Sequence, residues 1–448
     1  METTETTRES EDRAEARYKR LRSGPHRMTP EQVAANQRAR LEAAMIEAVA
    51  RHGYAAVTLR ELVGLAGVSK QTFYQHFESK QDCFLATFDA IVTEALKRVG
   101  GAYRAQTKGD FRERLLAALH AFMDLVVQAP EAAALVGVES LTLGSAGVGH
   151  RERGSEPFEE MVKQSFQHSR SRIDVSETMV RAVVGGWRGV VYHRLRDGRE
   201  GELPGLVPEL VDWALCYQRR PSAALNAAVR GVEDPVRVAV EDRSPVPLSE
   251  PASSKRSRAE LTQRERILRG AAQVVVDKGY DALSIPTISA AAGTSNQTFY
   301  EHFESKRDAF LAAFDLTASS ALRYCAAAFA AGEGRPEAVG TAIRGLLDYI
   351  STHELFARLA FFEVPTAGPV ALDRADETLK AFNAYLRPPL APEGIGGPVS
   401  DVVMEAIGTG TWVVLQYEIA HGRREQIADV GPDLCAVALA PFAAANRR

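Results

Sequence analysis

Residues 66–89 read AGVSKQTFYQHFESKQDCFLATFD, and residues 292–315 read AGTSNQTFYEHFESKRDAFLAAFD. These stretches belong to two longer segments, 53–89 and 279–315, which align without a gap and are identical at 21 of 37 positions. Identity of this extent within one chain indicates an internal duplication. One module, used twice, therefore decides the architecture.

Helix boundary signals occur at matching places in both copies. Thr29-Pro30-Glu31-Gln32 combines an N-cap, a proline in the first turn and a glutamine three residues after the cap, which is typical of a helix start. Further N-caps are predicted at Thr58, Ser69, Ser79, Thr262, Ser284, Ser295 and Ser305, and left-handed C-caps at Gly53 and Gly279. No stretch alternates apolar and polar residues as a strand would, so we predict an all-α fold.

The second and third predicted helices of each copy form a helix-turn-helix. In the first copy, Thr58 begins one helix, a tight turn at 66–68 has glycine at its centre, and Ser69 caps a helix that runs to about Phe77. Phe73 and Phe77 lie four residues apart and share the face that packs inward. Any one of these features is common in helical proteins, but the full combination occurs twice at the same spacing. This favours two DNA-binding modules over two ordinary helix pairs.

The opposite face of the third helix carries long hydrogen-bonding side chains. The side chains that can reach base edges in a major groove are Lys70, Gln71, Tyr74 and Gln75. Thr72, Tyr74 and His76 can donate to phosphate oxygens, although His76 taken alone fits a structural role equally well. Lys80 begins the next helix, where its ammonium is expected to face the DNA backbone.

The combined pattern resembles the TetR family of bacterial transcriptional regulators, here as two tandem copies. Both copies carry the Gly-Tyr pair (53–54 and 279–280), the Ala-Gly turn and the run F-Y-x-H-F-E-S-K. The resemblance implies that the first three helices of each copy bind DNA. It also implies that the remaining helices bind a ligand and dimerise, with the last two helices of each copy building a four-helix interface.

The resemblance assigns roles to individual positions. In the first copy, Arg60, Lys70, Gln71, Thr72 and Gln75 correspond to positions that read bases, and Tyr74, His76 and Lys80 to positions that grip phosphates. In the second copy, the base-reading positions hold Asn296, Gln297, Thr298 and Glu301, and the phosphate positions hold Tyr300, His302 and Lys306. The second copy departs from the pattern twice, because Pro286 stands in place of Arg60 and Glu301 in place of Gln75.

The repeat and its flanks predict six segments. They are a basic arm (1–28), a first helix-turn-helix domain (29–90), a first helical ligand-binding and dimerisation domain (91–220), an exposed linker (221–258), a second helix-turn-helix domain (259–316) and a second helical domain (317–448). Long apolar helices containing small residues are predicted at 177–196 and 399–421, followed by shorter ones near 207–217 and 431–445. These two pairs either pack together as an intramolecular pseudo-dimer or form the separate cores of the two halves.

Composition narrows the classes of function. The 448 residues include 54 Lys and Arg against 58 Asp and Glu, a net charge of −4, so a DNA-binding protein must concentrate its positive charge locally. Basic stretches at 17–27 and 255–269 would supply that charge or would simply be solvated. Four widely spaced cysteines favour buried, reduced thiols, and the pattern of apolar residues indicates no membrane span and no secretory signal. We therefore expect a cytoplasmic, nucleoid-associated bacterial protein that uses no metal or other cofactor.

Together these observations predict a sequence-specific transcriptional regulator that is not an enzyme. We expect a repressor of an imperfectly palindromic double-stranded DNA operator, released by a small apolar ligand. A second hypothesis is a regulator in which only the first helix-turn-helix binds DNA. A helical enzyme is least favoured, because H-E-x-x-H, G-x-S-x-G and phosphate-loop motifs are missing from the sequence. The sequence leaves open whether two chains pair further.

Overall fold

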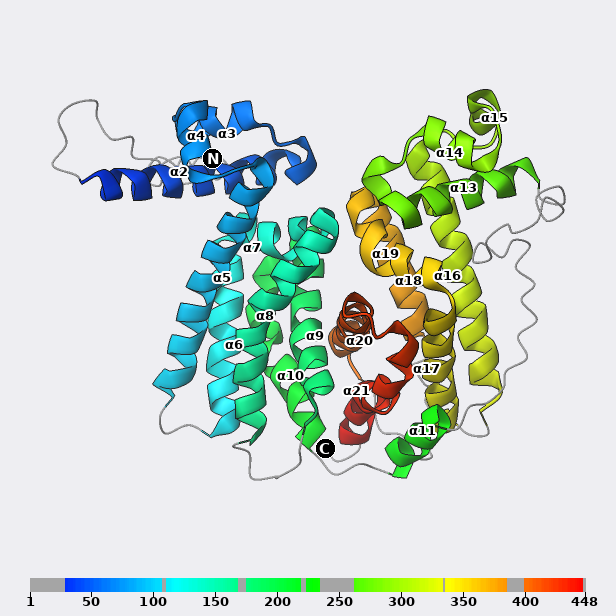
Figure 1. Ribbon diagram of the computed structural model, residues 1–448. Helices are drawn as coiled ribbons and strands as arrows, with labels where there is room; N and C mark the ends of the chain where they lie inside the picture. Colours follow the sequence, from blue (N-terminus) through cyan, green and yellow to red (C-terminus); the bar gives the residue numbers. More distant parts are fainter. Residues whose placement is uncertain are drawn as a thin grey trace, which may run out of the picture. The chain divides into compact units, whose positions relative to one another are not determined.

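The computed structural model describes residues 29–106, 110–167, 175–218, 223–233, 262–332, 335–384 and 399–445. Within these ranges every regular element is a helix (Figure 1), so the predicted all-α fold is confirmed. The chain divides into two compact units, one made of Met1–Ala105, Ala117–Gly154 and Arg194–Pro204, the other of Gln106–Leu116, Ser155–His193 and Gly205–Arg448. The second unit therefore combines the whole second copy with several helices of the first.

The helices follow the duplication. The first copy contains α2 (Pro30–His52), α3 (Leu59–Ala66), α4 (Lys70–His76), α5 (Lys80–Ala105), α6 (Phe111–Gln128), α7 (Pro130–Gly137), α8 (Gly144–Gln167), α9 (Glu177–Arg196) and α10 (Leu203–Leu215). The second contains α13 (Gln263–Lys278), α14 (Ile285–Ala292), α15 (Asn296–Tyr300), α16 (Lys306–Ala330), α17 (Arg335–Thr352), α18 (Glu354–Arg358), α19 (Pro369–Asn383), α20 (Asp401–Ala420) and α21 (Gly431–Ala445). Short turns of 3₁₀-helix lie at η1 (Tyr54–Ala56), η2 (Glu139–Leu143), η3 (Glu200–Glu202), η4 (Cys216–Gln218), η5 (Tyr280–Ala282), η7 (Val364–Ala367) and η8 (Arg424–Val430), and a π-helical turn at η6 (Leu359–Glu363).

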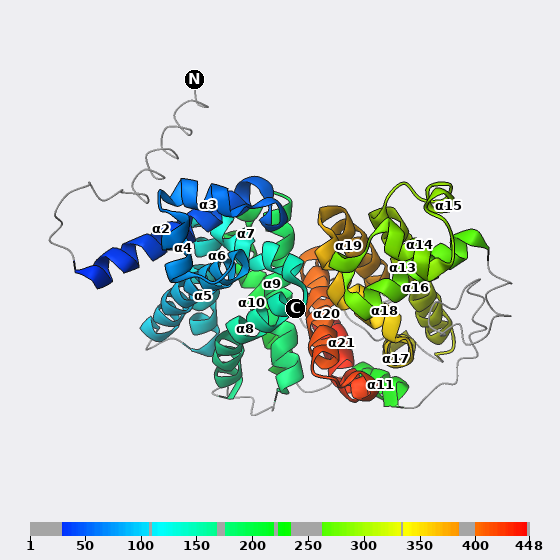
Figure 2. The ribbon, with the colours of Figure 1, turned by 45° about the horizontal axis from the view of Figure 1, so that its top comes forward.

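The first three helices of each copy form a small module around one apolar core (Figure 2). The apolar residues that recur at helical spacing in the first helices are buried: Leu41, Met45, Ala48 and Val49 on α2, and Ile267, Ala271, Val274 and Val275 on α13. Phe73 and Phe299 are fully buried in the third helices, and the beginning of α5 closes the first core with Phe84. The apolar spacing read from the sequence therefore positions the polar face of α4 outward.

The predicted helix caps form almost as expected. Thr29 and Gln32 make a reciprocal capping box, and the Ser69 hydroxyl accepts from the Thr72 amide at 3.0 Å. Ser295 caps α15 in the same way. Gly53 and Gly279 differ from the prediction: their φ values of +72° and +81° are as expected, but their ψ values of 155° and 168° lie outside the left-handed helical region. That combination is confined to glycine, because a side chain would clash there.

Small residues bring α9 and α20 together inside the second unit. A Cβ at Gly185 would lie 2.8 Å from the Val413 Cβ, and the Cβ positions at Gly189 and Gly410 are blocked by Thr409 and by the Ala182 carbonyl. These close approaches require glycine on both helices. Helix α9 of the first copy therefore packs against α20 of the second, as expected for copies paired within one chain.

The end of the first copy also contacts α21. The Tyr217 hydroxyl donates to the Val437 carbonyl at 3.0 Å, and the Ser176 hydroxyl donates to the Asp433 carboxylate at 2.7 Å. Both bonds join residues more than two hundred positions apart, and both lie inside the second unit. They extend the contact between the copies beyond the crossing of α9 and α20.

One part of the predicted linker is structured. Residues 223–233 form helix α11 (Ala223–Glu233), which packs against α17 and α21. Its Ala228 carbonyl lies where a Cβ on Gly340 would stand, and Val232 occupies the corresponding space at Gly431. The composition of this segment suggested an exposed chain, but its alanine, glycine and valine residues recur at helical spacing and form a buried face. The rest of the predicted linker lies outside the described residues.

Buried groups agree with the other sequence expectations. All four cysteines, Cys83, Cys216, Cys325 and Cys435, are buried and form no disulfide. Burial raises the pKa of the Cys83 thiol to about 12, which leaves it protonated and unreactive.

Among the described residues, no single helix is both long and apolar enough to span a membrane. Phe111–Gln128 and Pro130–Leu143 meet the length and composition criteria only as a pair, and they are bent by 107°.

Candidate nucleic-acid interface

The outward face of α4 presents most of the predicted DNA-contacting side chains. Arg60 on α3 and Lys70, Gln71 and Gln75 on α4 are exposed, while Thr72 is half-buried beside the Ser69 cap. Tyr74 is 59% exposed, although its ring meets Phe73 edge to face. An aromatic ring left this open has no role in the core of the module, so its exposure suits contact with another molecule.

The equivalent face of the second copy is shorter and carries less positive charge. Helix α15 ends at Tyr300, whereas α4 continues to His76. The predicted contact residues Asn296, Gln297, Tyr300 and His302 are exposed, and Thr298 is half-buried. Pro286 and Glu301 are exposed as well, so the structure places both departures from the repeat on the surface.

Lys80 and Lys306 do not lie as predicted. The Lys80 ammonium donates to the carbonyls of Tyr54 (3.0 Å) and Val57 (2.9 Å) and sits 4.3 Å above the Tyr54 ring. Lys306 donates to the Leu283 carbonyl at 2.8 Å. These ammonium groups point into their own modules because the carbonyls of the turn before the second helix need donors. Burial lowers the pKa of Lys80, which agrees with a group held away from solvent.

His76 and His302 contact the first helix of their module. The Nε2 atom of His76 lies 3.1 Å from Gln37 Oε1, and the Nε2 atom of His302 lies 3.3 Å from Gln263 Oε1. Burial and the nearby Arg38 lower the pKa of His76, so its imidazole is neutral at neutral pH. Each histidine therefore links the end of the recognition helix to the helix behind it.

An acidic residue missed by the sequence reasoning joins each module to the helical body of its own copy. The Tyr54 amide donates to Glu139 Oε2 at 2.8 Å, and the Tyr280 amide donates to Glu363 Oε2 at 2.8 Å. Both carboxylates reach the turn that follows the Gly-Tyr pair. The two glutamates lie 224 positions apart in the chain, close to the repeat offset of 226. That near-match is the signal that could have identified them.

A second missed residue fixes the turn of the helix-turn-helix. Arg40 on α2 donates to the carbonyls of Ala66 and Gly67, the latter at 2.9 Å. Gly67 adopts a left-handed conformation with φ 61° and ψ 42°, which terminates α3 and directs the chain into α4. Arg40 thus helps to orient α4 without reaching its outer face.

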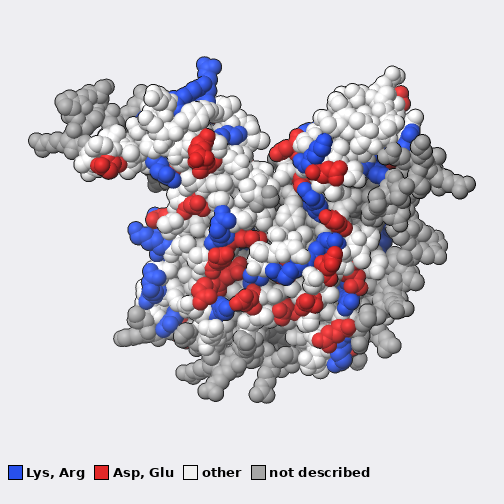
Figure 3. All heavy atoms as spheres, in the orientation of Figure 1, with Lys and Arg blue, Asp and Glu red and all other residues white. Residues whose placement is uncertain are grey.

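Surface charge differs between the two modules. In Figure 3, Lys and Arg atoms project from the α3–α4 end of the first module, while the α14–α15 end of the second is mostly uncharged with isolated groups at its margin. The residues responsible are Arg60 and Lys70 in the first copy and Pro286, Asn296 and Glu301 in the second. A phosphate backbone would be attracted more strongly to the first surface. The basic stretch 17–27, and residues 255–261 of the second basic stretch, lie outside the described residues.

Two segments, 41–87 and 267–313, match the family described as "Bacterial regulatory proteins, tetR family". They cover the two modules described above. The chain therefore carries two tandem tetR-like modules.

The relatives that match cover limited parts of the chain. The HTH-type transcriptional activator FasR of Mycolicibacterium smegmatis is 39% identical over 90 residues, which is 20% of this chain and 40% of that protein. Two solved structures match with low similarity. FadR of Bacillus halodurans, a fatty acid degradation regulator, is 15% identical with a TM-score of 0.36, over 39% of this chain and 96% of its own. PfmR of Thermus thermophilus is 22% identical with a TM-score of 0.31, over 40% and 96%.

Proposed function

We propose that this chain is a tetR-family transcriptional regulator that binds a double-stranded operator through the outer faces of α4 and α15. The observation that carries the proposal is the pair of matched modules, each with an inward aromatic face and an outward face of amides, hydroxyls and an exposed tyrosine. Such side chains suit base edges and phosphates in a major groove. We propose no catalytic role for the chain, because the family that its two modules match is one of regulatory proteins.

The two modules should prefer different half-sites. Lys70 suits guanine O6 and N7, whereas Asn296 at the aligned position suits adenine. Gln71 and Gln297 are identical, as are Tyr74 and Tyr300, so the half-sites share part of their sequence. We therefore propose an imperfect palindrome, with the tighter half-site under the first module. Lys80 and Lys306 act in this proposal as positioning residues that hold the turn before the second helix.

Ligand control would act through the Glu139 and Glu363 contacts. Each carboxylate bonds the turn beside a DNA-binding module to the helical body of its own copy, which carries the buried apolar side chains Met123 in the first copy and Phe356 and Phe361 in the second. A small apolar ligand inserted among such side chains would move η2 or η6. The module would then shift relative to its helical body, and the population competent to bind DNA would fall.

Operator occupancy would repress transcription where the site overlaps a promoter, because the bound protein excludes polymerase. The curated relative is an activator by its name, so the opposite sign is the competing outcome. A reporter driven by the operator-bearing promoter, with and without the regulator, distinguishes repression from activation.

A gel-shift titration of the full chain against its own promoter region tests the proposal. We expect a discrete, salt-sensitive complex that survives a large excess of nonspecific DNA. Equal binding to every sequence would refute the operator claim.

Two variants, Gln71→Ala and Gln297→Ala, distinguish DNA binding by both modules from DNA binding by the first module alone. If both modules bind, each variant weakens the complex and the doubly substituted chain weakens it further. If only the first binds, Gln297→Ala leaves the affinity unchanged. DNA footprinting on the same fragments shows which half-site each variant loses.

A further inference from the structure

A histidine of the first copy is held between two carboxylates of the second. His193, near the end of α9, places Nδ1 2.9 Å from Glu405 Oε1 on α20. Its Nε2 lies 3.5 Å from Asp376 Oδ1 on α19, an ion-pair distance. The His193 side chain is 17% exposed and both carboxylates are 20% exposed, so water screens this cluster poorly. All three residues belong to the second compact unit.

The imidazole of His193 in this cluster carries a positive charge. Burial lowers the pKa of His193, but the hydrogen bonds and charges of Asp376 and Glu405 outweigh burial and raise the pKa to about 9. The imidazole is therefore protonated at neutral pH, and both ring nitrogens can donate. Protonated His193 therefore places a positive charge between the carboxylates of Asp376 and Glu405.

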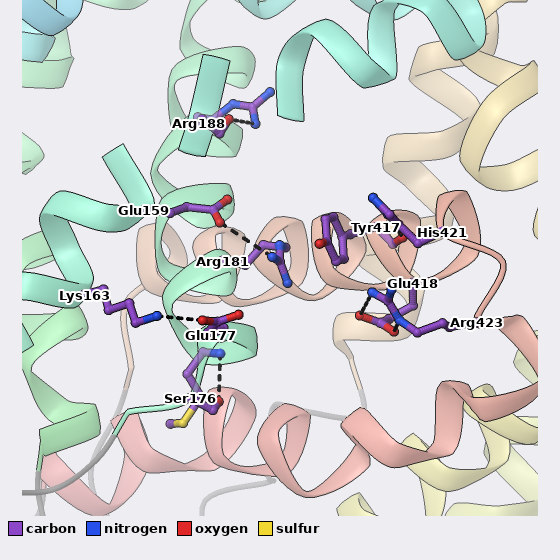
Figure 4. Close-up of polar contacts among 12 residues, drawn as sticks. Glu159, Lys163, Ser176, Glu177, Arg181, Arg188, Tyr417, Glu418, His421 and Arg423 are labelled. Carbon is purple, nitrogen blue, oxygen red and sulfur yellow. Dashed lines mark hydrogen bonds and ion pairs between the residues drawn. The ribbon is translucent and has the colours of Figure 1, made fainter. Parts of the chain in front are cut away.

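A second cation of the first copy reaches the second copy elsewhere along the same pair of helices (Figure 4). The Arg181 guanidinium on α9 lies 3.4 Å above the centre of the Tyr417 ring on α20 and pairs with Glu159 of its own copy at 3.7 Å. Across the crossing of α9 and α20, the first copy thus contributes cations. The second copy contributes carboxylates and the electron-rich face of an aromatic ring.

The aligned positions show that this complementarity is not symmetric. Superposing Trp187 on Trp412 and Tyr192 on Tyr417 in the sequence places His193 on Glu418. In the second copy Glu418 is buried and bonded to Arg423 of the same copy at 2.6 and 3.0 Å. The two copies therefore carry opposite charges at the same helical position.

We propose that His193, opposite Glu405 and Asp376, determines which copies associate. A first copy then pairs with a second copy, and two second copies do not pair with each other. Pairing two second copies would put Glu418, together with the Arg423 guanidinium that it bonds, where His193 stands, so that a third carboxylate would face Glu405 and Asp376 in place of an imidazolium. Like charges at this distance are disfavoured, and an unwanted partner is excluded by repulsion as well as by lost attraction.

Pairing two first copies loses a partner instead of gaining a repulsion. The residue aligned with Glu405 is Val180, which is buried and apolar, so a protonated His193 would lose its hydrogen-bonded carboxylate. A buried charge without its partner is costly. The surface formed by α9 thus fits the other half of this chain in preference to an identical half. The inference does not depend on the DNA-binding proposal, since it concerns the packing of α9 against α19 and α20 alone.

The pH dependence of stability tests the charged state of the cluster in the full chain. All three tryptophans lie on α9, α10 and α20, so tryptophan fluorescence during urea denaturation reports on this unit. Because the pKa of His193 is raised in the folded state, its contribution is complete below pH 6.5 and is lost as the pH rises through about 9. We expect the unfolding constant of the wild type to rise by about two orders of magnitude across that window relative to His193→Gln.

The control for this measurement is His52→Gln, which changes an exposed histidine of the other unit and should keep the wild-type profile. Identical pH profiles for the wild type and His193→Gln would overturn the proposal. So would a coupling between His193→Gln and Glu405→Gln, measured as a double-mutant cycle, that stays constant between pH 6.5 and 9.5.

A charge reversal at position 193 tests whether charge selects the partner copy. His193→Glu gives the first copy the residue that the second copy carries at this position, and so recreates the rejected pairing within one chain. We expect His193→Glu to unfold at least tenfold more readily than His193→Gln, and Glu405→Lys in the same chain to restore the loss. If His193→Glu is as stable as His193→Gln, or if Glu405→Lys does not restore the stability of His193→Glu, repulsion does not select the partner copy and the proposal is refuted.

Discussion

The first and second DNA-binding modules share one scaffold and present two different surfaces. Phe73 and Phe299 occupy equivalent buried positions, and Ser69 and Ser295 form equivalent caps. Glu139 and Glu363 accept equivalent 2.8 Å hydrogen bonds from the amides of Tyr54 and Tyr280. The outer faces differ at Lys70 and Asn296, Gln75 and Glu301, and Arg60 and Pro286. Three exposed positions have thus diverged, while Gln71, Thr72 and Tyr74 keep their residue types in the second copy, as expected if two copies read related but different half-sites.

The largest effect should come from the shared core. Phe73→Ala and Phe299→Ala each remove a ring that is fully buried, so each should destabilise its own module by about 3–5 kcal/mol. Hydrogen exchange measured by mass spectrometry should then accelerate in α2–α4 for the first variant and in α13–α15 for the second. Phe73→Leu and Phe299→Leu, which keep most of the volume, are the controls. Unequal losses in the two modules would mean that the scaffolds are not equivalent.

The next largest effect should separate the two surfaces. Lys70→Ala removes both a proposed base contact and a positive charge, so we expect about 5- to 150-fold weaker operator binding. The slope of the logarithm of affinity against the logarithm of salt concentration should become shallower by about one. Asn296→Ala removes a base contact only and should leave the salt dependence unchanged. Fluorescence anisotropy titrations at several salt concentrations measure both quantities. If Asn296→Ala flattens the salt dependence as much as Lys70→Ala does, the proposed charge asymmetry is wrong.

The lysines that hold the turn before the second helix allow a third comparison. Lys80→Met removes two hydrogen bonds, to the carbonyls of Tyr54 and Val57, although the Tyr54 carbonyl keeps the Val57 amide as a donor; Lys306→Met removes one such bond. We expect a loss of about 1–3 kcal/mol in the first module and a smaller loss in the second. Exchange rates of the amides in α3 and α14 report this difference. Losses in the reverse order would show that these bonds do not control the stability of the turn.

Glu301 of the second module should give a smaller effect in the opposite direction, a gain in operator affinity. Glu301→Gln restores the residue type of the first copy and removes a negative charge beside the proposed phosphate contacts. We expect operator affinity to increase by about two- to fivefold, because one exposed charge interaction is worth less than about 1 kcal/mol. Glu304→Gln, an exposed carboxyl beyond the end of α15, serves as the matched control. Unchanged affinity for Glu301→Gln would place this side chain away from the DNA.

Local signals in the sequence account for the module, and longer-range contacts account for what those signals missed. The Ser69 cap and the inward Phe73 depend on residues three or four positions apart, so their spacing alone predicted them. The Lys80 ammonium bonds a carbonyl 26 positions earlier, and Glu139 bonds an amide 85 positions away. Such pairs leave no local pattern.

Helix α11 was missed for a related reason. Its buried face consists of Leu225, Ala227, Ala228, Gly231 and Val232, mostly small residues that an exposed segment can also contain. The face becomes recognisable only beside its partner, because Gly340 on α17 lets the Ala228 backbone approach closely. The first copy carries Leu116 at the position aligned with Gly340, so α6 could not accept a helix in the same way.

The smallest predicted effect concerns the contact between α4 and α2. Burial, with a smaller effect from Arg38, lowers the pKa of His76 below 6.5, so the unfolded module binds a proton more readily than the folded one. The contribution of the His76–Gln37 contact is therefore complete above pH 6.5 and is lost as the pH falls through the lowered pKa. We expect exchange of the α4 amides, corrected for its intrinsic pH dependence, to accelerate between pH 7.5 and 5.5. His76→Gln should remove that acceleration, with α15 in the same sample as the internal reference. If His76→Gln exchanges with the wild-type pH profile, another group titrates in this window, and the histidine only fills space between the two helices.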